Sequence, residues 1–84
     1  MQDQMAELLY EGALALQQGQ TERARELLLR LVEMDENNED AWLWLSGAVD
    51  DVEDQRTALE NVLALNPQNQ YALYGLDVLE GRAQ

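Results

Sequence analysis

The stretches EDAWLWLSG (39–47) and RTALENVLALNPQN (56–69) decide the fold, because together they repeat the plan of the residues before them. The segment from Met5 closes in a similar way, with EMDENN (33–38), and a third segment restarts with QYALYGLDVLE (70–80). An internal period of this length indicates stacked helical repeats, whose units bury their apolar faces only against each other. We therefore expect a surface that holds partners rather than a pocket for chemistry.

Apolar residues recur at helical spacing in five segments, which are separated by turn-forming residues. We expect helices over roughly residues 3–18, 21–34, 39–49, 52–65 and 68–80, with Thr21 as a cap and with Pro67 and Gly81 as stops. The third helix is apolar almost all round, which predicts a central place in the stack. Inward stripes are expected in the second helix at Ala24, Leu27, Leu28, Leu31 and Met34, and in the fourth at Ala58, Leu59, Val62, Leu63 and Leu65.

The charge balance limits the classes of partner. Seventeen acidic residues face five arginines, the chain has no lysine, histidine or cysteine, and the net charge is −12. Such a field repels polyanions, so we expect no nucleic acid binding. With 46% hydrophobic residues the chain is expected to fold and to carry its acids on the surface. No apolar run approaches the ~20 residues that span a bilayer, so we expect one soluble, cytoplasmic domain without a membrane partner.

The pattern resembles the tetratricopeptide repeat, a helix-turn-helix unit of about 34 residues with a W-x₂-L-G opening, a second-helix alanine and a closing proline. The residues that match are Gly12, Gly19 and Ala24 in the first unit and Trp42, Leu45, Ser46 and Pro67 in the second. The resemblance is closest to short bacterial versions. It implies an all-α fold of five helices, a short right-handed α-solenoid of antiparallel hairpins. The units are repeat 1 (5–38), a shortened repeat 2 (39–69) whose deletion we place near residues 50–54, and a capping helix (70–81).

The resemblance also implies a concave groove lined by the first helix of each unit. The partner-binding residues that it implies are Leu9, Tyr10 and Ala13 in the first unit, Leu43, Trp44, Gly47 and Asp50 in the second, and Tyr71 and Tyr74 in the capping helix. Aromatic side chains supply large contact areas at small entropic cost. Aromatic residues at helical spacing also belong to cores, and Trp44 is equally compatible with packing on the first unit.

Family and charge together predict a non-catalytic protein-protein interaction module. Relatives that clamp a terminal carboxylate need lysine, asparagine and arginine in the groove, whereas this chain has no lysine. A peptide or helix that carries apolar anchors and basic residues fits the charge better. The alternative is a scaffolding segment of a larger bacterial protein, which forms a homodimer or homo-oligomer through the last helix, at Tyr71, Tyr74, Leu76 and Leu79.

Residues that carry chemistry are few. Asp35, Asn37 and Glu39 alternate like a calcium loop, but Asp40 stands where glycine is needed and Ser46 where glutamate is needed. We therefore expect no metal. The chain's one serine has no base near it in sequence, so we expect neither an enzyme nor a cofactor site. Two ion pairs are expected on helix surfaces, Glu26 with Arg30 and Glu53 with Arg56.

Overall fold

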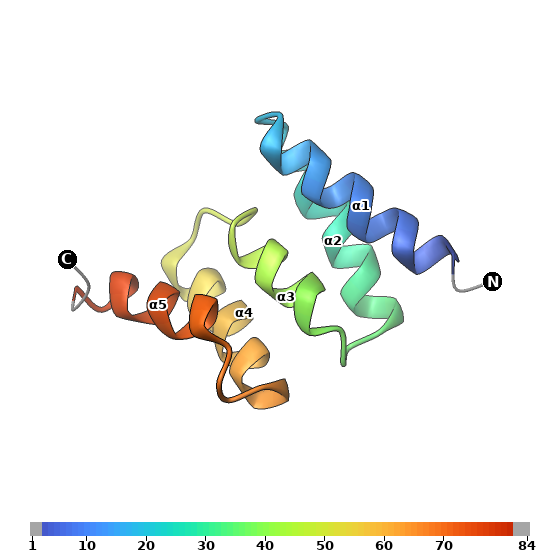
Figure 1. The fold of residues 1–84 in the computed structure, drawn as a ribbon. Helices are drawn as coiled ribbons and strands as arrows, with labels where there is room; N and C mark the ends of the chain where they lie inside the picture. The colour runs from blue at the N-terminus through green and yellow to red at the C-terminus, as the bar shows by residue number, and fades with distance from the viewer. Residues whose placement is uncertain (1–2, 82–84) are drawn as a thin grey trace.

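Five helices make up residues 3–81, the part of the chain that the computed structural model describes, and this part contains no β-strand. The helices are α1 (Asp3–Gln17), α2 (Thr21–Met34), α3 (Glu39–Ser46), α4 (Val52–Leu65) and α5 (Gln70–Leu79). α1 and α2 form an antiparallel pair at one end, α3 lies in the middle, and α4 and α5 lie at the other end (Figure 1). The expected all-α fold built from helical hairpins is confirmed.

Side-chain caps fix where three of the helices begin. Asn38, Asp51 and Asn69 each accept hydrogen bonds from backbone N–H groups in the first turn of α3, α4 and α5. Each such cap is worth about 1 kcal/mol. The expectation that Thr21 caps α2 is wrong, because Thr21 is the first helical residue and the preceding Gln20 makes no side-chain cap bond.

The third helix is shorter than the sequence pattern predicts, since α3 ends at Ser46 and not at Val49. The backbone N–H of Gly47 donates to the Trp44 carbonyl at 3.0 Å, so the helix tightens into a turn where it ends. α1 has 15 residues and α3 has 8. The first and second hairpins therefore differ in length where α3 ends and in the loop 47–51. The difference is not confined to residues 50–54, near which we expected the deletion.

Two apolar clusters form the core of the described residues. The first joins α1, α2 and α3 around Leu28 and Leu31, which are fully buried. The second joins α4 and α5 and contains Leu59, Val62 and Ala72. Trp42 packs against both clusters and so connects the two hairpins. The inward placement expected for Met34 and Leu65 is wrong. Met34 is 46% exposed and Leu65 is 37% exposed, because each is the last residue of its helix and lies beyond the packed part.

Glycine permits close approach of helices at one point in each half of the molecule. A Cβ atom added to Gly12 would lie 2.7 Å from both Cγ and Cδ2 of Leu28, so α1 and α2 touch where Gly12 has no side chain. A Cβ added to Gly75 of α5 would lie 3.0 Å from Cδ1 of Leu59 on α4. Both helix pairs are thus held at a distance that only glycine allows without adjustment.

Candidate partner-binding groove

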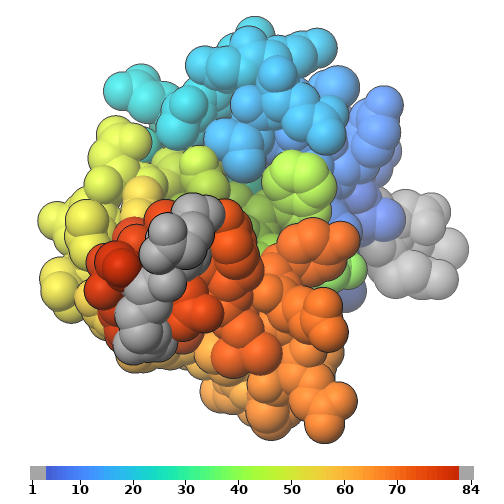
Figure 2. Space-filling model, turned by 60° about the vertical axis from the view of Figure 1, so that its left-hand side comes forward, coloured from blue at the N-terminus to red at the C-terminus, as the bar shows by residue number. Residues whose placement is uncertain are grey.

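A hollow of about 620 Å³ lies where α1, α3 and α5 face each other. Figure 2 shows part of α3, in green, exposed between the blue end of α1 and the orange start of α5. None of the lining side chains is charged. We call this feature the central hollow; its lining residues are Leu16, Leu43, Trp44, Ser46, Gly47 and Tyr71. The three helices that contribute are the ones from which the sequence predicts a groove, and four of the expected contact residues meet here.

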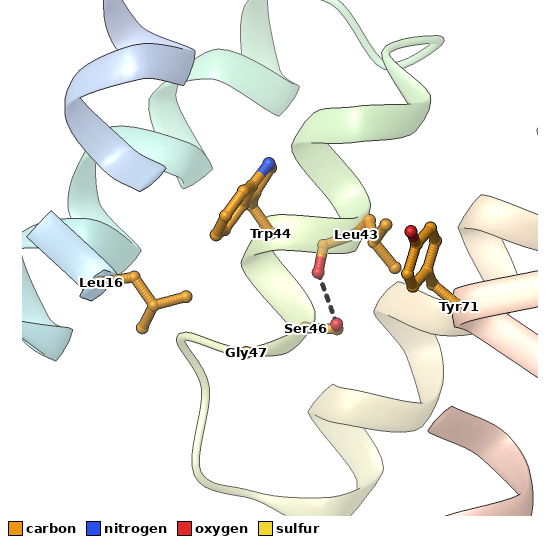
Figure 3. Close-up of a pocket in the computed structure, with 6 residues that line it drawn as sticks. All are labelled: Leu16, Leu43, Trp44, Ser46, Gly47 and Tyr71. Atoms are coloured by element: carbon orange, nitrogen blue, oxygen red, sulfur yellow. Dashed lines mark hydrogen bonds between the residues drawn. The ribbon is translucent and has the colours of Figure 1, made fainter. Parts of the chain in front are cut away.

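The end of α3 forms the floor of the central hollow (Figure 3). Leu43 and Gly47 are one helical turn apart, and Trp44 follows Leu43, so all three lie on one side of α3. Gly47 adds no side chain, and a Cβ placed there would lie 3.2 Å from Cδ2 of Leu16. Leu16 of α1 therefore approaches the backbone at the end of α3 closely, and a side chain at position 47 would crowd it.

Trp44 contributes to both the core and the central hollow. Its side chain is half-buried, packs against the first core cluster and lines the hollow. The two placements that its sequence position allows are therefore both realised. The neighbouring Trp42 has a different role, because its indole N–H donates to the backbone carbonyl of Glu36 at 2.8 Å and its ring connects the two core clusters.

Side chains from the flanking helices hold the loop after α3 in place. Nε of Arg25, on α2, donates to the Ala48 carbonyl at 2.9 Å, and Nε2 of Gln55, on α4, donates to the Val49 carbonyl at 2.9 Å. These bonds satisfy backbone carbonyls that lie just past the end of α3 and have no partner within a helix. They also fix the position of Gly47 at the edge of the central hollow.

The start of α3 is tied to the turn before α5 by a carboxylate. Oε2 of Glu39 accepts hydrogen bonds from Nδ2 of Asn69 at 2.6 Å and from Nδ2 of Asn66 at 2.9 Å. These two amides hold the pKa of the Glu39 carboxyl below its ordinary value, Asn69 more strongly than Asn66. Because α3 and α5 both line the hollow, this contact sets the distance between two of its walls.

The structure does not bring every expected contact residue to the central hollow. Tyr10 is 67% exposed and lines a separate depression together with residues of α1 and α2, including Glu11 and Arg23. Leu9 is half-buried against the first core cluster, and Ala13 is half-buried on the same helix. Tyr74 is 60% exposed on α5, one turn after Tyr71, and is not among the residues that line the hollow.

Two lining residues, Leu16 and Ser46, are not among the nine partner-binding residues named above, although Leu16 is a groove position that the resemblance implies for the first unit. Leu16 follows Leu9 by seven residues and so shares its face of α1, which is the signal that points to the groove. Ser46 occupies the small-residue position of the repeat, and its hydroxyl donates to the Leu43 carbonyl at 2.6 Å. This bond uses the hydroxyl hydrogen and leaves only acceptor capacity on the Ser46 oxygen.

Acidic residues lie in the first turn of α3 and in the loop after it, while the α5 wall carries no charge near the hollow. Asp40 is exposed in the first turn of α3, on the face that also carries Leu43 and Trp44. Asp50 follows Gly47 in the loop; its side chain is 91% exposed and lies 3.7 Å from Arg25. No Asp, Glu, Lys, Arg or His occurs between Glu60 and Asp77. The groove is thus apolar, with acids at the ends of its central helix.

Two further acids, Asp35 and Glu80, have structural partners. Oδ1 of Asp35 accepts from the backbone N–H of Asn37 at 3.1 Å. Within residues 3–81 no group of three or more His, Cys, Asp and Glu side chains is arranged to hold a metal. The expected pair of Glu53 with Arg56 is wrong, since Arg56 reaches across to α5 and its Nη1 lies 2.8 Å from Oε2 of Glu80.

Comparison of the chain with known proteins gave no match to a family model, to a curated protein or to a solved structure. Among the described helices, none combines the length and the apolar character that crossing a bilayer requires.

Proposed function

We propose that this chain is a non-catalytic protein interaction module of the tetratricopeptide type, which binds a peptide or helix of a partner in the groove formed by α1, α3 and α5. The central hollow carries this proposal, because it is apolar, uncharged in its lining and placed on the first helices of the repeated units. Ligand sites in proteins are typically concave and mostly apolar, with few polar groups. The groove fits that description without any further side chain.

The partner we propose combines apolar anchors with basic residues. The apolar anchors would pack on the aliphatic surface of Leu16 and Leu43 within the central hollow. The basic residues would lie near Asp40 and Asp50, in the field of a chain whose net charge is −12. Complementary fields raise the association rate and exclude partners of like charge.

A panning experiment with an occluded variant tests this proposal. Gly47 has a negative φ of −85°, so no left-handed backbone conformation forbids a side chain there. Gly47→Met adds a side chain at the edge of the hollow, where it displaces Leu16 and fills the space. A library of random twelve-residue peptides displayed on phage would be panned on the immobilised wild-type chain and on the variant. We expect enrichment of peptides with apolar residues flanked by lysine or arginine, on the wild type alone. Equal enrichment on both proteins, or none on the wild type, would refute the proposal.

A second candidate is self-association through α5, which its exposed apolar residues favour. Tyr71 and Tyr74 are exposed as expected, whereas Leu76 and Leu79 pack on the second core cluster. The exposed aliphatic residues of α5 are instead Leu73, at 45%, and Val78, at 51%. Sedimentation velocity over a hundredfold range of concentration tests this candidate. A dimer that dissociates on dilution and is lost in Leu73→Glu supports it, and a monomer at every concentration removes it.

A further inference from the structure

We propose that the central hollow receives the side chain of an arginine from the partner polypeptide. This inference rests on the proposed function and specifies one group that enters the site beside the apolar anchors. It follows from three features of the lining: two aromatic rings, a floor whose hydrogen-bond donors are used, and no competing cation among residues 3–81.

The aromatic rings provide surfaces on which a planar cation can stack. In Figure 3 the rings of Trp44 and Tyr71 stand on either side of Leu43. Tyr71 is 76% exposed, so one of these rings is open to an incoming group. A guanidinium group stacks on aromatic faces, and its apolar stem packs along aliphatic surface such as that of Leu43.

Hydrogen-bond donors at the floor of the hollow are already used. The Ser46 hydroxyl donates to the Leu43 carbonyl at 2.6 Å, and the Gly47 N–H donates to the Trp44 carbonyl at 3.0 Å. The Trp44 indole nitrogen points away from Ser46 and Gly47 in Figure 3. A carboxylate or phosphate would therefore find few donors at this floor. A guanidinium, which has five N–H donors and no acceptor, can use the remaining lone pairs.

Among residues 3–81, no basic residue competes for the aromatic surfaces. No arginine of this part of the chain lines the hollow, and Arg25 is held by the Ala48 carbonyl at 2.9 Å and by Asp50 at 3.7 Å. The chain's net charge of −12 attracts a cation toward the site from a distance. The net charge of the chain and the lining of the hollow therefore both favour a guanidinium group.

The peptides recovered by panning provide the probes. Each arginine-containing peptide would be resynthesised with citrulline, lysine or norleucine in place of the arginine, and binding measured by fluorescence anisotropy. Citrulline keeps the shape of arginine and removes its charge, so we expect roughly tenfold weaker binding, within the range for cation–π contacts. Peptides that bind without arginine, or equally well with citrulline, would overturn this inference while leaving the proposed function intact. Failure to recover any peptide would instead refute the proposed function.

Matched variants locate the effect at the hollow. Tyr71→Leu removes an exposed ring of the lining, whereas Tyr10→Leu removes a ring of similar exposure in a separate depression. We expect the preference for arginine over citrulline to fall severalfold in Tyr71→Leu and to stay unchanged in Tyr10→Leu. Trp44→Leu should act like Tyr71→Leu, but Trp44 also packs on the core, so Tyr71 gives the cleaner test. An unchanged preference in Tyr71→Leu would overturn the inference.

Discussion

Replacing Gly12 by alanine probes the closest contact between α1 and α2. The added Cβ would lie 2.7 Å from Cγ and Cδ2 of Leu28, whose side chain is fully buried. Cγ is the branch point of the leucine and not its free end, so no simple rotation relieves the clash. We expect α1 and α2 to move apart and the domain to lose stability.

The magnitude follows from two opposing terms. Glycine to alanine within a helix gains about 1 kcal/mol of intrinsic helix stability, and overpacking a filled core costs about 1–3 kcal/mol. The expected net loss for Gly12→Ala is about 1 kcal/mol, by the difference of these terms. Gly75→Ala is the matched control: the nearest atoms there are the δ carbons of Leu59, at 3.0 and 3.3 Å, which can rotate away. We expect that variant to be neutral or slightly more stable.

Urea unfolding followed by circular dichroism at 25 °C measures both free energies, with the m-value as a check on two-state behaviour. The double variant Gly12→Ala with Leu28→Ala isolates the contact, because removing the leucine side chain leaves room for the new methyl group. We expect Gly12→Ala to be less damaging in that background than in the wild type. If Gly12→Ala and Gly75→Ala change stability equally, the close packing of α1 on α2 is not what constrains position 12.

Two further predictions concern contacts that position α3. Because the pKa of the Glu39 carboxyl is lowered in the folded state, the unfolded chain binds the proton first as the pH falls. The stability advantage of the wild type over Glu39→Gln should therefore be complete at neutral pH and should shrink below about pH 4.5. Urea midpoints of both proteins between pH 3 and 7 measure this difference. A difference that stays constant with pH would show that the Glu39 carboxylate does not stabilise the fold through these hydrogen bonds. Arg25→Ala should cost about 1 kcal/mol, because the Ala48 carbonyl loses its charged donor. Asp50→Ala, the control, should cost under ~0.5 kcal/mol, since that side chain is 91% exposed. Amide hydrogen exchange at residues 47–51 should become faster in Arg25→Ala and stay unchanged in Asp50→Ala.

The helices and most of the core were predictable from sequence, because apolar spacing and turn residues act locally. The expected starts of α3 and α4 agree with the structure, where Asn38 and Asp51 cap these helices. α5 begins at residue 70, two residues later than expected, because Asn69 caps it. The end of α3 was not predictable in this way. Ala48 and Val49 continue the apolar pattern, but their carbonyls bond to Arg25 and Gln55, which come from other helices. The partner that Arg56 finds in Glu80 likewise depends on the packing of α5 on α4.

The sequence predicted which helices line the candidate site better than it predicted which of their residues do so. The repeat placed Leu43, Trp44, Gly47 and Tyr71 on one surface, and the structure gathers them around the central hollow. The rotation of α1 decides that Leu16 and not Tyr10 faces this hollow, and that rotation is set by packing on α2. Periodicity alone gives the faces of a helix but not which of them meets a third helix.

The uncharged span between Glu60 and Asp77 makes the two sides of the groove respond differently to ionic strength. Contacts along α3 include Asp40 and Asp50, whose attraction for a cation weakens as added salt shortens the Debye length. Contacts with the start of α5 involve no ionised group of the chain, so salt leaves them nearly unchanged. The slope of affinity against salt concentration therefore reports along which wall a bound segment lies.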